Sequence, residues 1–366
     1  MRVIALEAVD FRNLAQVVVE PHPRFNVLHG DNGQGKTNLL EAVYLLGTLR
    51  SFRAAKTEEL IRFGQARARV RARVSRLGTE RLLEVELSPG HKSARLDGKH
   101  ARSSQYFGGF NVVLFAPEDL RLPRGAPSGR RRFLDRAIFN AQPGYLAEAQ
   151  SYERVLRSRN ALLRSGAFDP ALLEVYETQL AEAAVPLVTR RHRFVEALAP
   201  KVAETFSRVT GGLSLEIAYE STLDVPEERI AGLLRERLLA ERRRDAARGA
   251  TSSGPHTDDL ALRFEGRAAG AYASQGQLRA IVLALKIAEI EQLTSALGDA
   301  PVLLLDDVSS ELDATRNAQL FEFLREVPSQ AFITTTHPAH VLLTKDRQDY
   351  QVVSGTISIE KGDPAC

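Results

Sequence analysis

Residues 25–48 read FNVLHGDNGQGKTNLLEAVYLLGT, and this stretch decides the fold class. The mainly apolar residues 25–28 predict a short buried strand, and a glycine-rich loop follows them directly. Beyond the loop, Leu39, Leu40, Val43 and Leu46 recur at the spacing of one helix face. A strand, a glycine-rich loop and a helix in this order are typical of nucleotide-binding α/β domains.

The loop between the strand and the helix fits the pattern G-x-x-x-x-G-K-[ST] in full. Its glycines permit backbone conformations that aim successive N–H groups at phosphate oxygens, and the helix start adds a partial positive charge. We expect Lys36 to reach the β- and γ-phosphates and the Thr37 hydroxyl to ligate Mg²⁺. The predicted nucleotide-binding residues of the loop are Gly30, Asp31, Asn32, Gly33, Gln34, Gly35, Lys36 and Thr37.

An acidic strand end is the second chemical signal. Residues 302–307 read VLLLDD, so four apolar residues predict a strand buried on both faces that ends in two carboxylates. Asp306 is placed to hold Mg²⁺, and Asp307 is placed to orient the attacking water or accept its proton. Alone, such an ending is equally compatible with a capping role, and the phosphate loop is what favours the catalytic interpretation.

A third signal is the stretch ASQGQ at 273–277, which we call the signature segment and which opens a predicted helix. Ser274, Gly276 and Gln277 at a helix start form a second candidate anion site, although a simple helix cap is the alternative. Its distance in sequence from the phosphate loop suggests that the two do not serve one nucleotide within one chain. His337, after the next predicted strand, is either a γ-phosphate sensor or a structural histidine.

Composition restricts the class of protein. The 366 residues predict two or three domains, and 44% hydrophobic with 26% charged residues is typical of a globular protein with a sizeable core. No apolar run is long enough to cross a bilayer, and Glu7 and Asp10 stand where a signal peptide would be apolar. With Cys366 as the single cysteine, we expect no disulfide framework and no cysteine metal site, and we expect a cytoplasmic protein.

Positive charge is concentrated in one part of the chain. Residues 50–102 hold 14 Lys and Arg against 6 Asp and Glu, whereas the whole chain has a net charge of only +3. Four arginines alternate with small apolar residues, so a strand would place them all on one face. This arginine row, predicted to contact the DNA backbone, comprises Arg67, Arg69, Arg71 and Arg73. A solvated edge strand protected by its charges is the alternative.

Two further basic clusters are weaker candidates for DNA contacts. They lie at Arg124 with 130–132 and at 242–244, and the second is equally compatible with a solvated helix face. The sequence contains no tryptophan and no recognition helix that we can identify. We therefore expect DNA binding through phosphates and duplex shape, with strong salt dependence.

The order of elements predicts an interrupted ATPase domain. Strands are predicted at 66–74, 82–96, 111–115, 302–305 and 331–335, and helices at 145–165, 170–197, 200–210 and 228–247. The flexible stretch 249–255 is a predicted boundary. We expect an N-terminal ATPase part at 1–125, a helical lobe at 126–249 and a C-terminal ATPase part at 250–366.

Taken together, these motifs resemble the ABC-type ATPases. The Phe11-Arg12-Asn13 turn is similar to the arginine motif of the chromosome-maintenance (SMC) branch, which implies that Arg12 reaches the nucleotide phosphates. Several stretches resemble the RecF family of bacterial recombination mediators: SFR at 51–53, FAPEDL at 115–120, RRRFLD at 130–135, GPHTDDL at 254–260 and LLLDDVSSELD at 303–313. The resemblance implies an α/β, ABC-type P-loop ATPase head domain with an inserted, mainly helical lobe.

The resemblance also implies a function. ATP with Mg²⁺ would be held in a head-to-tail homodimer, by residues 30–37 of one subunit and by Ser274 and Gly276 of the other. The dimer would close on double-stranded DNA beside single-stranded gaps and assist RecA loading together with RecR and RecO, without a membrane. Slow, DNA-dependent ATP hydrolysis would release it.

Some positions depart from the family pattern, and two other functions stay open. Asp307 stands where ABC ATPases usually carry Glu, and Gln275 replaces the first signature glycine, so slow hydrolysis is expected. Thr257 stands where RecF-like sequences carry a basic residue, and Glu118 is a weak candidate for a metal-contacting loop position. The alternatives are an ATPase subunit of a membrane transporter and a metabolic P-loop kinase.

Overall fold

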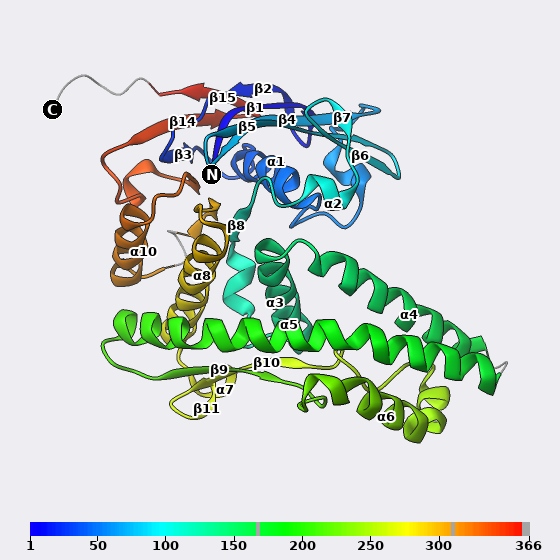
Figure 1. Ribbon diagram of the computed structural model, residues 1–366. Helices are drawn as coiled ribbons and strands as arrows, with labels where there is room; N and C mark the ends of the chain where they lie inside the picture. The colour runs from blue at the N-terminus through cyan, green and yellow to red at the C-terminus, as the bar shows by residue number, and fades with distance from the viewer. Residues whose placement is uncertain (166–168, 309–311, 361–366) are drawn as a thin grey trace. The chain divides into compact units, whose positions relative to one another are not determined.

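The apolar stretch before the phosphate loop forms β3 (Phe25–His29), a fully buried strand in the computed structural model of the chain. The structure describes residues 1–165, 169–308 and 312–360. It divides into two units, one made of Met1–Arg121 with Leu285–Cys366 and the other of Leu122–Ala284 (Figure 1). Both ends of the chain therefore build the unit that carries the phosphate loop.

A mainly parallel sheet forms the nucleotide-binding side of the first unit. Its strand order is β15-β14-β3-β13-β12-β8, and β15 alone runs antiparallel to its neighbour. Because the neighbours β3, β13 and β12 are parallel, the residues that follow them meet at one edge of the sheet. The other strands are β8 (Val112–Phe115), β12 (Val302–Asp306), β13 (Ala331–Thr335), β14 (Arg347–Val353) and β15 (Thr356–Ile359).

An antiparallel sheet is the second layer of this unit, with the strand order β2-β1-β4-β5-β6-β7. The hairpin expected at the N-terminus is present as its first two strands, and the predicted strand at 82–96 is divided in two by a turn. The strands are β1 (Arg2–Phe11), β2 (Leu14–Val19), β4 (Ala68–Arg76), β5 (Thr79–Ser88), β6 (His91–Leu96) and β7 (Lys99–His100).

Helix α1 (Lys36–Thr48) contacts strands of both sheets and closes the core between them. Leu39, Leu40, Val43 and Leu46, the predicted apolar face, are all buried. The remaining helical segments of this unit are α2 (Ser103–Tyr106), α10 (Ala314–Glu326) and the single turns η1 (Thr57–Leu60), η2 (Pro117–Arg121) and η3 (Pro338–His340). Packing on both sides fixes the first turn of α1, which carries the phosphate loop.

The second unit is mainly helical, as its sequence predicts. Its helices are α3 (Pro127–Ala141), α4 (Tyr145–Ser165), α5 (Pro170–Thr210), α6 (Glu227–Arg248) and α7 (Ala269–Tyr272), and α8 (Gln275–Leu297) begins in it. It also holds a sheet of β9 (Leu215–Glu220), β10 (Asp259–Phe264) and β11 (Arg267–Ala268). None of the helices within the described part of the chain has the length and apolarity to cross a membrane.

The unit boundaries differ slightly from the expected ones at the first junction and strongly at the second. The first falls at 121 rather than at 125, but the second falls at 284, within α8, rather than at 249. Pairing between β9 and β10 explains the difference, because it joins residues on the two sides of the flexible stretch 249–255 into one sheet. That stretch is therefore internal to the second unit.

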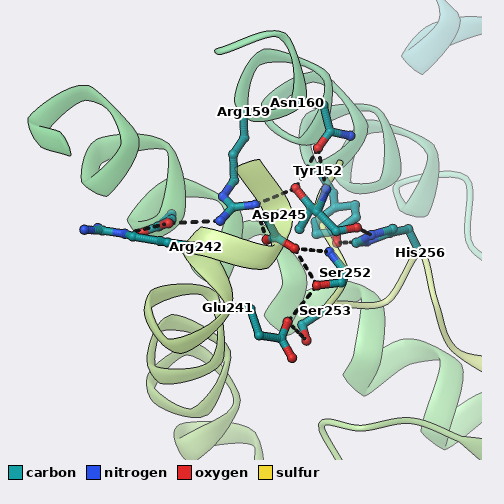
Figure 2. A network of polar contacts seen from close by, with 11 residues as sticks. Tyr152, Arg159, Asn160, Glu241, Arg242, Asp245, Ser252, Ser253 and His256 are labelled. Carbon is teal, nitrogen blue, oxygen red and sulfur yellow. Dashed lines mark hydrogen bonds and ion pairs between the residues drawn. The ribbon is translucent and has the colours of Figure 1, made fainter. Parts of the chain in front are cut away.

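A buried polar network fastens the same stretch to the helices (Figure 2). Arg159 of α4 is fully buried and donates to Asp245 of α6 at 2.7 Å and to Glu177 of α5 at 3.0 Å. It also donates to the Thr251 hydroxyl at 2.8 Å, so one guanidinium joins three helices and a loop. These three hydrogen bonds, two of them also ion pairs, replace water around the buried guanidinium, which is the condition for burying such a charge.

Candidate nucleotide-binding site

The phosphate loop has backbone conformations that only glycine adopts without strain. Gly30 has φ +141°, and a Cβ there would lie 2.4 Å from the Val352 carbonyl oxygen. Gly35 has φ +113°, and a Cβ there would lie 2.6 Å from Asn13 Oδ1. Residues 31–33 between them are exposed. The two ends of the loop therefore pack closely against Val352 and Asn13, and its middle is open to a ligand.

Lys36, the lysine of the loop, is buried at the start of α1. Its ammonium donates to the carbonyl oxygens of Gly30 and Asp31, the second at 2.9 Å. Burial lowers the pKa of Lys36, while the carboxylates of Asp307, Asp306 and Asp31 act to raise it. A cation held on weak carbonyl partners beside the loop is available to bind phosphate oxygens.

Thr37 and Asp306 meet as the sequence predicts for a metal site. The Thr37 hydroxyl donates to Asp306 Oδ1 at 2.7 Å, and the Thr334 hydroxyl donates to the same oxygen at 2.8 Å. Burial raises the pKa of Asp306, and these two hydrogen bonds act to lower it. Hydroxyl and carboxylate oxygens are the hard ligands that Mg²⁺ prefers when phosphates and waters complete its shell. The residues present therefore fit a magnesium ion that arrives with a nucleotide.

Asp307 and His337 follow two adjacent strands at the same sheet edge. Asp307 has φ +50°, and its backbone N–H donates to the Thr334 hydroxyl at 2.9 Å. His337 is exposed, and its Nδ1 accepts from the Ala339 N–H at 3.2 Å. The fold brings both side chains to the end of the sheet that carries the loop, and their catalytic roles remain predictions.

Arg12 is engaged by a carboxylate rather than by the loop. Its Nε and Nη2 donate to Glu41 at 2.8 and 3.0 Å, and its Nη1 donates to the Glu59 carbonyl oxygen at 2.8 Å. Glu41 is fully buried in α1 and also accepts from the Ser51 hydroxyl. If Arg12 left this pair, a buried carboxylate would lose its counter-charge. The phosphate contact implied by the resemblance therefore stays a prediction.

Asn13 connects the phosphate loop to two other segments, a role that the sequence analysis missed. Its Nδ2 donates to the Gln34 carbonyl oxygen at 3.0 Å, and its Oδ1 accepts from Asn38 at 2.8 Å. The turn between β14 and β15 holds the same loop residue, because the N–H groups of Gly355 and Ser354 donate to the oxygens of Gln34 at 2.8 and 2.6 Å. Only a hairpin-type Ser-Gly pair in the sequence could have indicated this turn.

The signature segment lies in the second unit and caps α8. The Ser274 N–H donates to Gln277 Oε1 at 2.7 Å, and the Gln277 N–H donates back to Ser274 Oγ at 3.3 Å. This reciprocal arrangement is a capping box. The cap considered as an alternative is thus present, but Ser274 is also exposed. A second role toward a nucleotide held by another chain stays a prediction.

The arginines of the arginine row alternate with buried residues as expected, but their strand is not at the edge of the sheet and acidic side chains lie beside them. Arg69, Arg71 and Arg73 lie on one face of β4, and the residues between them are buried. The edge-strand alternative is wrong, because β4 lies between β1 and β5. Glu7 pairs with Arg69 at 3.2 Å and with Arg71, so carboxylates already relieve the repulsion among these cations. The row's contact with DNA stays a prediction.

The other singled-out residues are distributed as follows. Arg130 pairs with Asp259 at 2.6 Å and Arg242 with Glu177 at 2.6 Å, so parts of both weaker basic clusters serve the structure of the second unit. The Thr257 hydroxyl donates to the Gly254 carbonyl oxygen, and Glu118 is exposed on η2. Residues 309–311 and Cys366 lie outside the described part of the chain.

Comparison with known proteins agrees with this geometry. The family described as "RecF/RecN/SMC N terminal domain" matches residues 2–356. A protein of Anaeromyxobacter sp. strain Fw109-5, named "DNA replication and repair protein RecF", is 48% identical over 98% of this chain and 99% of its own length. A protein of Myxococcus xanthus with the same name is 47% identical over 92% of this chain and 91% of its own length.

Solved structures show the same relationship. The structure described as "the recombination mediator protein RecF-ATP in RecFOR pathway" has a TM-score of 0.90 and 31% identity, covering 98% of this chain and 97% of its own. An Smc head bound to the C-winged helix domain of ScpA has a TM-score of 0.58 at 17% identity, which shows a shared fold alone. The α/β P-loop ATPase fold expected from the sequence is confirmed, and the chain belongs to the RecF/RecN/SMC N-terminal domain family, within it to the RecF proteins.

Proposed function

We propose that this chain is an ATP-dependent DNA-binding protein of recombinational DNA repair. The observation that carries the proposal is the joint placement of Lys36, Thr37 and Asp306 around a loop whose middle is open. A triphosphate would take the place of the carbonyl oxygens that now bind the Lys36 ammonium. Mg²⁺, held by Thr37 and Asp306, would neutralise phosphate charge. The names of the relatives favour repair over the transporter subunit and the metabolic kinase.

ATP is proposed to close a homodimer through the signature segment of a second copy. Ser274 is exposed at the start of α8, and a helix start attracts phosphate oxygens. Because the γ-phosphate would be bound by both copies, nucleotide state would shift the population between monomer and dimer. Asp307 would orient the attacking water, and its short side chain suits slow hydrolysis.

The dimer is proposed to bind double-stranded DNA beside single-stranded gaps in the cytoplasm and to act with RecR, RecO and RecA. The basic segment 50–102 supplies the charge for backbone contacts. Such contacts release counterions, so the affinity for DNA should fall steeply as the salt concentration rises.

Nucleotide binding by Lys36→Met, with Lys99→Met as the control, tests the proposal. Lys99 is an exposed lysine of β7, so its loss removes equal charge away from the loop. Lys36→Met should lose ATP binding and with it the DNA-stimulated release of inorganic phosphate, and Lys99→Met should keep ATP binding. Equal ATP affinity in the two variants would refute the assigned role of the loop.

A further inference from the structure

Phe63 is the most exposed large apolar side chain in the described part of the structure. Its exposed fraction is 102%, and the next, Leu77, reaches 69%. A phenylalanine ring normally gains free energy by leaving water, so this ring forgoes that gain in the free protein. It is therefore available to any partner that presents a flat apolar face.

The ring is presented by a fixed turn. Gly64 has φ +83°, and the Gln65 N–H donates to the Arg62 carbonyl oxygen at 2.9 Å, so Phe63 is the second residue of a tight turn. The Arg62 N–H donates to the Asp10 carbonyl oxygen at 2.8 Å, which attaches the turn to β1. A side chain on such a turn loses little conformational freedom when it binds.

The segment 10–13, to which the Phe63 turn is attached, also contacts the phosphate loop. Two residues after Asp10, the Arg12 N–H donates at 2.8 Å to the carbonyl oxygen of Leu60, which shortly precedes the Phe63 turn. Asn13 then donates to Gln34 of the loop. The Phe63 turn and the phosphate loop are thus both attached to residues 10–13 within one unit.

The surroundings of the ring identify the kind of partner. The segment 50–67 contains five Lys and Arg and two Glu, and Phe63 is its only large apolar side chain among the exposed ones. One of the two acids, Glu58, accepts from the Gly90 N–H at 2.7 Å. A protein interface requires a contiguous apolar centre, which this segment lacks. Arg62 pairs with Asp10 at 3.5 Å but is 43% exposed, and a single ring on a segment with excess positive charge suits a base with its phosphate.

We propose that Phe63 is a stacking platform for a nucleobase, with the neighbouring basic residues facing the attached phosphates. Two sources supply this chemistry: the adenine of the nucleotide on residues 30–37, and an unpaired base at the edge of a DNA gap. The proposal rests on the proposed function, because both sources are ligands of that function.

The first arm of the test measures nucleotide binding by calorimetry in the full chain. Phe63→Ala is compared with Phe63→Trp, which restores an aromatic face, and with Leu77→Ala, which removes an exposed apolar side chain from another turn. If adenine is the base, Phe63→Ala weakens ATP roughly 5- to 150-fold. It leaves inorganic triphosphate unaffected, because that ligand has no base, and Phe63→Trp restores ATP affinity.

The second arm uses a gapped duplex with 2-aminopurine as the first unpaired base. If a DNA base is the ligand, wild-type protein and Phe63→Trp quench the probe and prefer gapped to continuous duplex. Phe63→Ala loses the quenching and the preference but keeps its affinity for continuous duplex, which measures backbone contacts alone. Because the ring contacts water, all variants should unfold at the wild-type urea concentration.

The outcomes separate this proposal from the function on which it rests. If Phe63→Ala loses ATP affinity in the first arm, or quenching and gap preference in the second, and Phe63→Trp restores them, the stacking platform is supported. The arm that shows the loss identifies the source of the base. Wild-type affinities for ATP and for gapped DNA in Phe63→Ala would overturn the platform and leave the proposed function standing. A wild-type protein that binds neither ATP nor DNA would overturn both.

Discussion

Arg159 balances the charge of two buried carboxylates in the second unit. It is fully buried between Asp245 and Glu177, and these carboxylates have little access to water. Glu177 would keep its pair with Arg242, but the buried Asp245 would lose its counter-charge, and removing one partner of a buried pair costs about 3–5 kcal/mol. We therefore predict a loss of that order in the free energy of unfolding for Arg159→Met, measured by urea denaturation.

An exposed ion pair provides the control for this prediction. Arg263 donates to Glu220 at 2.8 Å, but both side chains are about half exposed. Exposed pairs contribute less than about 1 kcal/mol. Arg263→Met should therefore change the free energy of unfolding little. Similar losses for Arg263→Met and Arg159→Met would contradict the role of Arg159 in balancing the buried carboxylates.

His256 makes the stability of the second unit depend on pH. Its Nδ1 faces the Tyr152 hydroxyl at 2.7 Å, and its Nε2 faces the Thr251 carbonyl oxygen at 3.0 Å. Burial lowers the pKa of His256. Since the unfolded chain then takes up the proton first, stability decreases as the pH falls below about 6.5 toward the folded-state pKa.

The variant His256→Gln isolates this effect. The stability difference between wild type and His256→Gln should shift against the wild type by up to about 1.4 kcal/mol per pH unit below about pH 6.5. Urea denaturation at about pH 7.5 and about pH 5.5 measures it, and buried Asp258, whose raised pKa acts in the opposite direction, is common to both proteins. A difference that does not change with pH would show that His256 is not held neutral.

At the scale of elements, the turn between β14 and β15 should control nucleotide affinity. A Cβ on Gly355 would lie 2.3 Å from the Asn13 carbonyl oxygen, so Gly355→Ala must displace the turn from Gln34. Losing one or two hydrogen bonds to the loop corresponds to roughly 10-fold weaker ATP binding. Calorimetric titration with ATP measures the change.

Gly98→Ala is the matched control for the turn. Gly98 has φ +78°, close to the +80° of Gly355, but a Cβ there meets nothing within 4 Å. Both variants should lose about 1 kcal/mol of stability from the strained conformation. Only Gly355→Ala should lose ATP affinity, and equal affinities would contradict the positioning role.

Elements defined by local sequence were predictable, whereas those defined by distant partners were not. The phosphate loop and its flanking strand and helix depend on residues close in sequence, and all appear at the expected positions. By contrast, α5 continues without a break into Pro200, where the sequence predicts that a helix at 170–197 ends and a second one at 200–210 begins. An internal proline costs about 3 kcal/mol, which the long buried face of α5 offsets.

The same distinction applies to the candidate site. Thr37 and Asp306 could be paired from the sequence because parallel strands deliver their ends to one edge. The contacts of Glu7 with the arginine row and of Ser354 with Gln34 join residues 62 or more positions apart. No periodicity or motif encodes such contacts, so they required the fold.

At the scale of the whole molecule, the account depends on nucleotide shared between two copies. Lys36, Thr37 and Asp306 belong to the first unit, and Ser274 belongs to the second. Ser274→Arg places a bulky cation at the exposed start of α8, without touching the phosphate loop. We predict that it retains ATP affinity in calorimetry but no longer forms the ATP-dependent dimer.

Sedimentation velocity with and without Mg²⁺-ATP tests this central claim most directly, using wild type, Lys36→Met and Ser274→Arg at micromolar concentration. The wild type should be a monomer without ATP and a dimer with it, whereas both variants should stay monomeric. A wild-type protein that remains monomeric while saturated with ATP, or a Ser274→Arg protein that dimerises normally, would contradict the account.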